Sequence, residues 1–428
     1  MNIRLQASGS RRRNPKRVQN AVLLFALLTG FAILAVDTSH AQDWPQWRGP
    51  ARSGVVQGFK PPAQWPDRPR QIWKVQVGVG HASPIVVSNR VYVFSRVGEQ
   101  EILSSRDVAS GKEIWRQGYD APYQVNPAAS AHGKGPKSTP VHDGGRIFTL
   151  GISGIVSAWQ AQDGRRVWTK DFKKEFPSTV PDYGVAMSPA VVNGMLIVHV
   201  GGTGNGAIMA LDPATGAAKW TYKGDGPAYA SPIVATFGGV QQIVTQSQRN
   251  LVALGLDGRV LWQVPFATEY DQNAITPIAI GDLLVYAGLS KPTTALRPTV
   301  TNGKWQTPQV WQNADIPMYM STAVESGGYL FGLTHRNRGQ FFCVDARTGK
   351  TMWTTKGREG ENAAMLAAGT FILAMTTEAE LVVLRNETKA ADVVKRYTIA
   401  DSPVWAHPVV VGSGIIVKDA ESMAYWVF

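Results

Sequence analysis

Short apolar runs separated by polar or glycine-containing turns recur along most of the chain. Residues 83–95, 188–200 and 276–288 each hold two segments rich in β-branched residues around such a turn. This pattern predicts pairs of antiparallel strands joined by tight hairpins. A third segment and its turn follow, as in "DPATG" (212–216) and "DARTG" (345–349), where aspartate can accept hydrogen bonds from turn amides and glycine tolerates positive φ. The repeating unit is therefore a series of short strands.

An aromatic residue marks the fourth segment of each unit. In "DPATGAAKW" and "DARTGKTMW" the tryptophan comes four residues after the turn glycine. Successive marker positions are 42 to 53 residues apart, a period typical of four-stranded propeller blades. We expect each ring to act as a wedge between neighbouring blades, because a flat aromatic recurs once per predicted sheet. The marker residues are Trp73, Trp115, Trp168, Trp220, Trp262, Trp311, Trp353 and Tyr397.

The two ends of this repeat complement each other. Seven complete units end at the markers from Trp115 to Tyr397. Residues 407–428 then predict three strands without a fourth, whereas residues 71–77, "QIWKVQV", predict a lone outer strand. Pairing them completes an eighth sheet and covers two open edges. The predicted fold is all-β: an eight-bladed β-propeller of four-stranded antiparallel blades, with the last blade completed by the N-terminal strand.

The first 41 residues differ in composition from the rest of the chain. Residues 1–20 carry six Lys or Arg side chains, and residues 21–36 are almost entirely apolar. The small residues Ser39 and Ala41 favour cleavage after Ala41, which predicts a signal peptide. An uncleaved anchor is the alternative, but an apolar stretch of 16 residues is short of the about 20 that a membrane span needs.

The predicted domain boundaries follow from this leader and from the repeat. They are a signal peptide at 1–41, an N-terminal extension at 42–70 and the propeller at 71–428. Export followed by cleavage predicts a periplasmic or secreted bacterial protein without a stable membrane anchor.

Composition excludes several classes of function. Beyond residue 41, 37 basic and 30 acidic residues leave a net charge of +7, without a Lys/Arg stripe interleaved with aromatics, so we expect no nucleic-acid partner. The single cysteine, Cys343, excludes an intramolecular disulfide. The chain contains no Cys-x-x-Cys pair, no His-Glu-x-x-His motif and no glycine-rich phosphate loop, which leaves metal and catalytic residues unassigned.

The repeated "DxxTGxxxW" phrase in a predicted eight-membered ring resembles the PQQ-like β-propeller repeat superfamily. That superfamily includes the quinoprotein alcohol dehydrogenases and the BamB-type outer-membrane assembly lipoproteins. The opening "DWPQWRGPARSGV", residues 43–55, is similar to the start of many secreted PQQ-like propeller proteins. The resemblance covers nearly all of residues 43–428 and is specific for fold, whereas one fold hosts many activities.

The two branches of the superfamily imply different functions. Resemblance to the dehydrogenases implies pyrroloquinoline quinone and calcium in an axial funnel, with an aspartate base and commonly a pair of adjacent cysteines. Here there is no cysteine pair, and Cys343 lies on a predicted third strand. Resemblance to the BamB-type proteins implies a non-catalytic role, although residue 42 is glutamine where a lipoprotein carries cysteine. We therefore predict an exported, non-enzymatic protein- or ligand-binding scaffold; a PQQ-dependent quinoprotein oxidoreductase is the alternative.

The loops that lead from an outer strand to the next inner strand rim one face of a propeller funnel, where a ligand or partner would bind. A Ser/Thr-Pro pair at the start of most inner strands sets a common register. The residues three positions before the proline, or before its equivalent, are His81, Lys137, Ala186, Tyr229, Ala274, Met320, Glu361 and Trp405. Five of these are chemically diverse and are the predicted cofactor- or ligand-binding residues: His81, Lys137, Tyr229, Glu361 and Trp405. Pyrroloquinoline quinone is the cofactor that the resemblance allows.

Other polar residues near these strand entrances have simpler expected roles. The hydroxyl residues one position before the proline are predicted to make turn and strand-end hydrogen bonds. His132 and His407 have no second ligand-type residue at metal-binding spacing. They are therefore expected to be solvated loop histidines.

Overall fold

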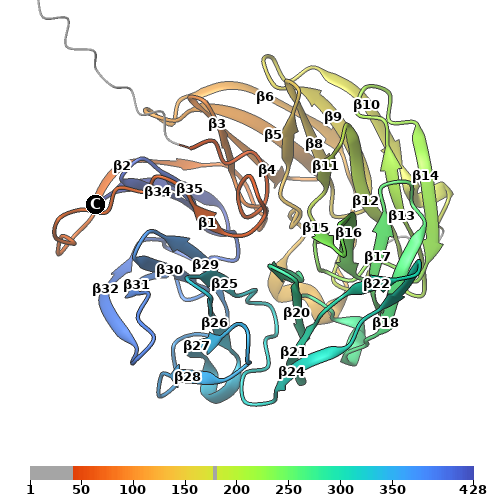
Figure 1. The fold of residues 1–428 in the computed structure, drawn as a ribbon. Helices are drawn as coiled ribbons and strands as arrows, with labels where there is room; N and C mark the ends of the chain where they lie inside the picture. The colour runs from red at the N-terminus through yellow and green to blue at the C-terminus, as the bar shows by residue number, and fades with distance from the viewer. Residues whose placement is uncertain (1–41, 177–180) are drawn as a thin grey trace, which may run out of the picture. The chain divides into compact units, whose positions relative to one another are not determined.

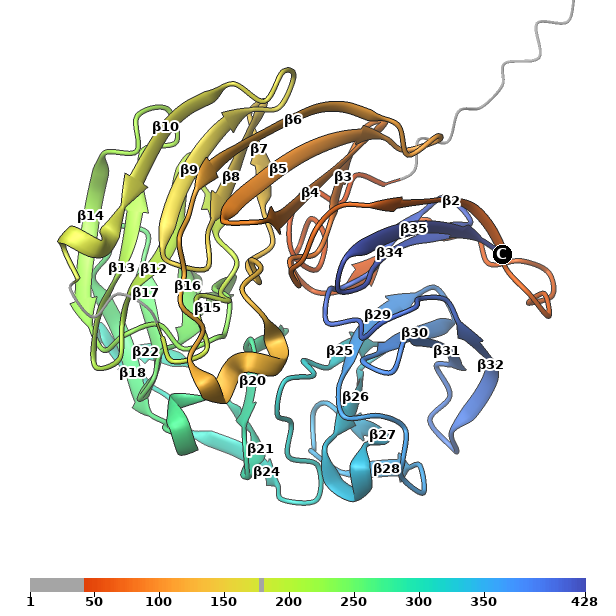
Figure 2. The same ribbon diagram turned by 180° about the vertical axis from the view of Figure 1, so that it is seen from behind.

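The computed structural model describes residues 42–176 and 181–428, and the predicted signal peptide lies outside this part of the chain. These described residues form a ring of eight four-stranded sheets (Figures 1 and 2). Within each blade, the four neighbouring strands pair in antiparallel fashion from the axis outward, as in the blade of β11 to β14. The predicted eight-bladed propeller is confirmed. Nowhere in the two described ranges is a helix long and apolar enough to cross a membrane.

The first four blades follow the order of the sequence without interruption. Their strands are, for blade 1, β3 (Ile85–Val87), β4 (Arg90–Val97), β5 (Gln100–Asp107) and β6 (Glu113–Asp120); for blade 2, β7 (Val141–Asp143), β8 (Arg146–Leu150), β9 (Ile155–Gln160) and β10 (Arg166–Asp171); for blade 3, β11 (Ala190–Val192), β12 (Met195–Gly202), β13 (Asn205–Leu211) and β14 (Ala218–Gly224); and for blade 4, β15 (Ile233–Phe237), β16 (Val240–Gln246), β17 (Asn250–Gly255) and β18 (Val260–Pro265).

The last four blades include one insertion and one split sheet. Their strands are, for blade 5, β19 (Ile278–Ile280), β20 (Leu283–Gly288), β21 (Lys291–Leu296) and β24 (Gln309–Asn313); for blade 6, β25 (Val324–Ser326), β26 (Tyr329–Thr334), β27 (Gln340–Asp345) and β28 (Thr351–Thr354); for blade 7, β29 (Ala363–Ala368), β30 (Phe371–Thr376), β31 (Glu380–Arg385) and β32 (Asp392–Thr398); and for blade 8, β33 (Val409–Val411), β34 (Gly414–Lys418), β35 (Ser422–Val427) and β2 (Arg70–Gln76).

Short elements connect or extend these blades. A hairpin of β22 (Thr299–Thr301) and β23 (Lys304–Gln306) is inserted in blade 5, and β1 (Val55–Val56) lies against blade 7. Four 3₁₀ turns lie in loops: η1 (Pro127–His132), η2 (Phe172–Lys174), η3 (Glu269–Asp271) and η4 (Arg336–Arg338).

Blade 8 joins an N-terminal strand to the last three strands of the chain. Strand β2 pairs antiparallel with β35, with Trp73 opposite Tyr425. The Trp65 ring also packs edge-on against Phe428, with the ring centroids 5.0 Å apart. The predicted completion of the last blade by an N-terminal strand is therefore confirmed, and the pairing covers the edges of both strands.

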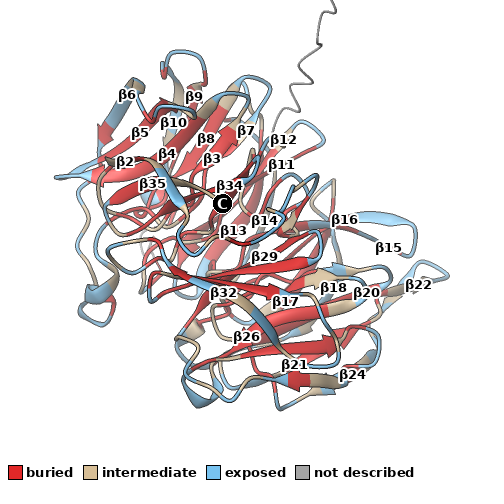
Figure 3. Cartoon of the chain, turned by 90° about the vertical axis from the view of Figure 1, so that its left-hand side faces the viewer, coloured by how far each residue is buried: buried red, intermediate tan, exposed pale blue. Residues whose placement is uncertain are grey.

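Burial falls from the inner strands of each blade to the outermost strand. Strand β12 is buried along almost its whole length, whereas β14 of the same sheet is mostly exposed. Figure 3 shows the same gradient, with buried residues along middle strands such as β4 and β8. The continuous apolar runs of the sequence are thus strands buried between neighbouring sheets, which explains why they lack strict alternation.

The marker aromatics on the outer strands join each blade to the next. The indole N–H of Trp168 donates to the Pro213 carbonyl oxygen at 3.0 Å, in the turn of the following blade. Gly216 of that turn has a φ of +71°, and a Cβ atom there would lie 2.9 Å from the Trp168 ring. Glycine is therefore required at this position for two reasons: the turn needs a positive φ, and the indole packs where a side chain would lie. The predicted wedge role is confirmed.

The inserted hairpin replaces one of these contacts. Blade 5 carries β22 and β23 where other blades have the short turn, and the indole N–H of Trp262 donates to Gln242 Oε1 of its own blade at 2.6 Å. A Cβ at Gly238 of blade 4 would lie 2.8 Å from the hairpin residue Val300. The hairpin thus contacts blade 4 in place of the usual turn.

Candidate functional site

Residues 44–56, which we name the axial segment, cross the axis of the ring before the first blade begins. Trp44 forms a β-bridge with Val86 of blade 1, and β1 pairs in parallel with β29 of blade 7, with Val55 opposite Ala367. The segment therefore contacts the inner strands of non-adjacent blades. The sequence analysis did not predict this path.

Two buried arginines hold the axial segment to opposite sides of the ring. The Arg48 guanidinium donates to the carbonyl oxygens of Thr322 (3.0 Å) and Ala323 (2.7 Å), at the entrance of blade 6. Arg52 donates to the carbonyl oxygens of Ser188 and Pro189, both at 2.9 Å, at the entrance of blade 3. Burial lowers the pKa of both guanidinium groups to about 9, so both remain protonated at neutral pH. Within the described ranges, neither arginine lies within salt-bridge distance of a carboxylate.

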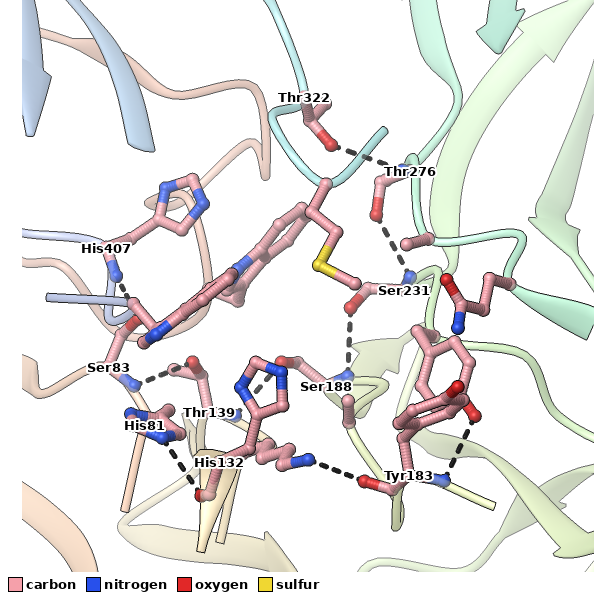
Figure 4. Close-up of a pocket in the computed structure, with 18 of the residues that line it drawn as sticks. His81, Ser83, His132, Thr139, Tyr183, Ser188, Ser231, Thr276, Thr322 and His407 are labelled. Carbon is pink, nitrogen blue, oxygen red and sulfur yellow. Dashed lines mark hydrogen bonds between the residues drawn. The ribbon is translucent and has the colours of Figure 1, made fainter. Parts of the chain in front are cut away.

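The hydroxyl residues at the strand entrances form a chain of hydrogen bonds from blade to blade. The backbone N–H of Thr139 donates to Ser188 Oγ at 3.0 Å, and that of Ser188 donates to Ser231 Oγ at 2.9 Å. The same bond joins further neighbours, as Figure 4 shows: His407 to Ser83, Ser83 to Thr139, Ser231 to Thr276 and Thr276 to Thr322. The predicted strand-end bonding is confirmed, and the acceptors lie on the adjacent blade.

A cavity of about 400 Å³ lies on the axis inside this ring of hydroxyls (Figure 4). Trp47 of the axial segment is part of its wall, beside side chains from seven blade-entry loops. Its larger side chains are Trp47, His81, His132, Lys137, Tyr183, Tyr229, Gln272, Tyr319, Met320, Trp405 and His407. Neither aspartate nor glutamate belongs to the lining of this cavity in the described residues.

Four of the five predicted binding residues line this cavity. They are His81, Lys137, Tyr229 and Trp405. The fifth, Glu361, is exposed and is not among the lining residues; its backbone N–H donates to Glu378 Oε1 at 2.9 Å. The common register therefore brings four of these side chains together, although their role in binding stays a prediction.

Lys137 is the only Lys or Arg among the lining residues of the described chain. Its Nζ donates to the Tyr183 carbonyl oxygen at 2.5 Å. Burial lowers its pKa to about 8, because removing an ammonium group from water disfavours its charged form. The group is still mainly protonated at neutral pH.

Three histidines contribute neutral imidazoles to the cavity. His81 Nε2 lies 3.1 Å from the carbonyl oxygen of His132, and its pKa falls to about 3 through burial and the nearby charges of Lys418 and Lys137. The pKa of His407 falls to about 3 through burial and the charge of Arg48. The prediction that His132 and His407 are solvated loop histidines is wrong, because both are partly buried in the cavity wall. His407 precedes Pro408 and so occupies the hydroxyl position of the common register, which could have placed it at the cavity, whereas His132 lies outside that register and no local pattern marked it.

Aromatic rings form two groups on the wall. The rings of Tyr183 and Tyr229 pack edge-on at 5.9 Å, and those of His132 and Trp405 pack edge-on at 4.9 Å. Burial raises the pKa of Tyr229 above its usual range, so its hydroxyl stays protonated. Lys137 belongs to the entrance of blade 2, between the blade 8 loop that bears Trp405 and the blade 4 loop that bears Tyr229.

The donor set of the cavity does not fit a calcium–quinone pair. Calcium takes six to eight oxygen ligands, with carboxylates prominent among them. The lining of the cavity, as far as the structure describes it, offers imidazoles, hydroxyls and an amine instead. In residues 42–176 and 181–428, no three His, Cys, Asp or Glu side chains are grouped so as to hold a metal ion.

The ring of eight four-stranded blades, with an aromatic residue on each outer strand, defines the chain as a PQQ-like β-propeller. A family model described as "Outer membrane protein assembly factor BamB" matches residues 98–355, and the chain belongs to this family. The BamB protein of Yersinia pestis is 28% identical over 239 residues, covering 51% of this chain and 56% of that protein. The 1-butanol dehydrogenase (cytochrome c) of Thauera butanivorans is 25% identical, covering 49% of this chain and 30% of that enzyme. The chain thus spans about half of the first relative and less of the second.

Solved structures of both branches share the fold. BamB from Moraxella catarrhalis matches with a TM-score of 0.61 at 15% identity, covering 84% of this chain and 98% of that chain. A europium-containing methanol dehydrogenase matches with a TM-score of 0.67 at 14% identity, covering 90% of this chain and 91% of that chain. At such identities the likeness shows the fold alone.

Proposed function

We propose that the protein is an exported, non-enzymatic scaffold that binds a small ligand or a protein partner at its axial cavity. The observation that carries this proposal is the wall of the cavity. It combines aromatic rings, a lysine and neutral imidazoles, and among its described residues there is no carboxylate that could act as a base or ligate calcium. Such a mixture of apolar surface and a few convergent polar groups is typical of binding sites.

The relatives support a location and a kind of partner. Several of them carry the name outer membrane protein assembly factor and come from bacteria. Together with the predicted signal peptide, this favours a periplasmic or secreted protein that binds other proteins through its loops. The predicted absence of a lipid anchor and of a nucleic-acid partner belongs to the same proposal.

A turnover assay tests the non-enzymatic part of this proposal. The purified protein, without residues 1–41, is incubated with pyrroloquinoline quinone, calcium, a primary alcohol and an artificial electron acceptor. We expect no acceptor reduction above that of a heat-denatured sample. Sustained turnover that depends on the quinone would overturn the proposal.

The second candidate is a PQQ-dependent quinoprotein oxidoreductase. It is favoured by the likeness to the butanol and methanol dehydrogenases. Against it stands the cavity wall, whose imidazoles and hydroxyls do not make a calcium site. A ligand that binds only the folded state must raise the unfolding temperature. A quinone titration with calcium that leaves both the absorption spectrum and the Tm unchanged would therefore remove this candidate.

A further inference from the structure

The charge of Lys137 has no counterion inside the cavity. Its ammonium group accounts for one hydrogen bond, to the Tyr183 carbonyl, and none of the described lining residues is acidic. A partly buried cation without an anion is unfavourable, because the protein interior solvates charge poorly. An anionic ligand would supply the missing charge.

Further positive charges lie behind the cavity wall. Arg48 and Arg52 are buried under the Trp47 ring, with their guanidinium carbons 5.5 and 5.7 Å from its centroid. Lys418 Nζ, also buried, donates to the Gly80 carbonyl oxygen at 2.5 Å and lies close enough to His81 to lower the pKa of that histidine. Asp419 and Glu421 offset part of the Lys418 charge. Arg48 and Arg52 have no such carboxylate within salt-bridge distance in the described ranges, so they add a positive potential in a region of low dielectric constant, where it is screened little.

The remaining wall is suited to a planar apolar body. The Trp405 and His132 rings lie on one side of Lys137, and the Tyr229 and Tyr183 rings lie on the other. Aromatic rings bind flat ligands by stacked or edge-on contacts. The buried Nδ1 atoms of His81 and His407 have no hydrogen-bond partner in the described structure, so the polar capacity of both imidazoles is only partly used.

We infer that the axial cavity binds a small aromatic carboxylic acid, with its carboxylate on Lys137 Nζ, its ring between the Trp405 and Tyr229 sides, and no divalent cation. This inference rests on the proposed binding function and names the chemistry of the ligand. It differs from what the dehydrogenase likeness implies, because the charge of the acid is matched by an amine and not by a metal ion.

Calorimetric titration with two matched probes tests this ligand class. Naphthalene-2-carboxylate and its neutral analogue naphthalene-2-carboxamide have the same ring, so their difference reports the charge. In EDTA-containing buffer at pH 7, we expect the acid to bind about tenfold or more tightly than the amide, the gain typical of a hydrogen bond to a charged group. Equal affinities, binding of neither probe, or binding of the acid only after calcium is added would each overturn the inference.

Variants of two lysines on one loop locate the charge. Lys137→Met should lower the affinity for the acid to that for the amide, whereas Lys134→Met should keep the difference in affinity between the two probes. Lys134 is the matched control, because it is exposed and pairs with Glu99 at 3.0 Å. Thermal unfolding of the ligand-free variants checks that both are folded. If Lys137→Met retains the preference for the acid, the carboxylate is bound elsewhere and the inference is wrong.

A variant of the wall and a third probe complete the test. Tyr229→Ala should weaken the binding of the acid and of the amide by the same factor, because both probes carry the naphthalene ring. Tighter binding of 2-naphthyl phosphate than of the carboxylate would reassign the site to organic phosphates. If these probes do not bind as expected, the inference about the ligand is wrong. The non-enzymatic proposal is tested separately by the turnover assay, so the failure of one can be distinguished from the failure of the other.

Discussion

The outer rim and the axis of this propeller follow opposite rules. On the rim, a tryptophan of one blade packs on a glycine turn of the next, and the same contact is repeated around most of the ring. On the axis, the entrances of seven blades bring imidazole, amine, phenol, indole and thioether side chains to one cavity, and Trp47 comes from outside the repeat. Repetition is suited to stability, because each sheet must bury the same faces. Diversity is suited to binding, because a ligand presents different groups in different directions.

The largest expected effect is the loss of a rim tryptophan. Trp311 is 7% exposed, and its indole N–H donates to the Ala346 carbonyl oxygen at 3.0 Å. Trp311→Ala should lower the free energy of unfolding by about 3–5 kcal/mol, the usual cost of removing a large buried aromatic. Urea denaturation measures the loss. Ile114→Ala, at a rim side chain that is 46% exposed, should change stability by less than about 0.5 kcal/mol. Similar losses for both variants would contradict the wedge role.

A smaller effect is expected at the turn glycine. Gly216→Ala introduces both an unfavourable positive φ and a methyl group against the Trp168 ring, and should cost about 1–3 kcal/mol. Gly194 is the matched control, since its φ is +67° and a Cβ there would meet nothing within 4 Å. Gly194→Ala should therefore show the backbone strain alone. If both variants lose the same stability in urea, the indole contact does not constrain the turn.

The axis should be more sensitive to acid than the rim. Burial lowers the pKa of His81 and His407 to about 3 in the folded protein, whereas an unfolded histidine titrates near 6.5. The unfolded chain thus binds more protons, so this contribution to stability is complete above about pH 6.5 and is lost as the pH falls toward 3. We expect Tm to fall between pH 7 and 4.5, and His407→Gln to flatten that fall. Gly216→Ala, a change on the rim, should lower Tm by a similar amount at every pH and leave the dependence of Tm on pH as it is. If His407→Gln also leaves that dependence unchanged, His407 is not a source of the acid sensitivity.

The smallest effect is expected at Glu361. Its side chain is exposed and does not line the cavity. Glu361→Gln should leave the unfolding free energy within about 0.5 kcal/mol of the wild-type value. Its affinity for naphthalene-2-carboxylate should be unchanged in the same calorimetric titration. A clear gain in that affinity would show that the charge of Glu361 reaches the site.

The fold could be predicted from the chain because its signals are local. The DxxTG turn and the following tryptophan lie within nine residues, and a turn, a hairpin and an aromatic wedge each depend on near neighbours. The same register predicted where His81, Lys137, Tyr229 and Trp405 enter the cavity, because equivalent positions of successive blades must point to the same axis. Glu361 follows that register and still stays outside, since its backbone is held by Glu378.

The sequence alone determined three features of the protein. The period of the aromatic markers gave the number of blades, the unpaired strands at both ends gave the closure of the ring through β2, and the register of the inner strands gave the face on which a site is predicted. Only the tertiary structure decided what the axis contains. Trp47, Arg48 and Arg52 belong to a segment without repeat, and the two arginines contact blades 3 and 6 at residues that are 136 to 275 positions away in the sequence. Contacts of this kind depend on how the closed ring brings distant strands together, and no local pattern of hydrophobic and polar residues records them.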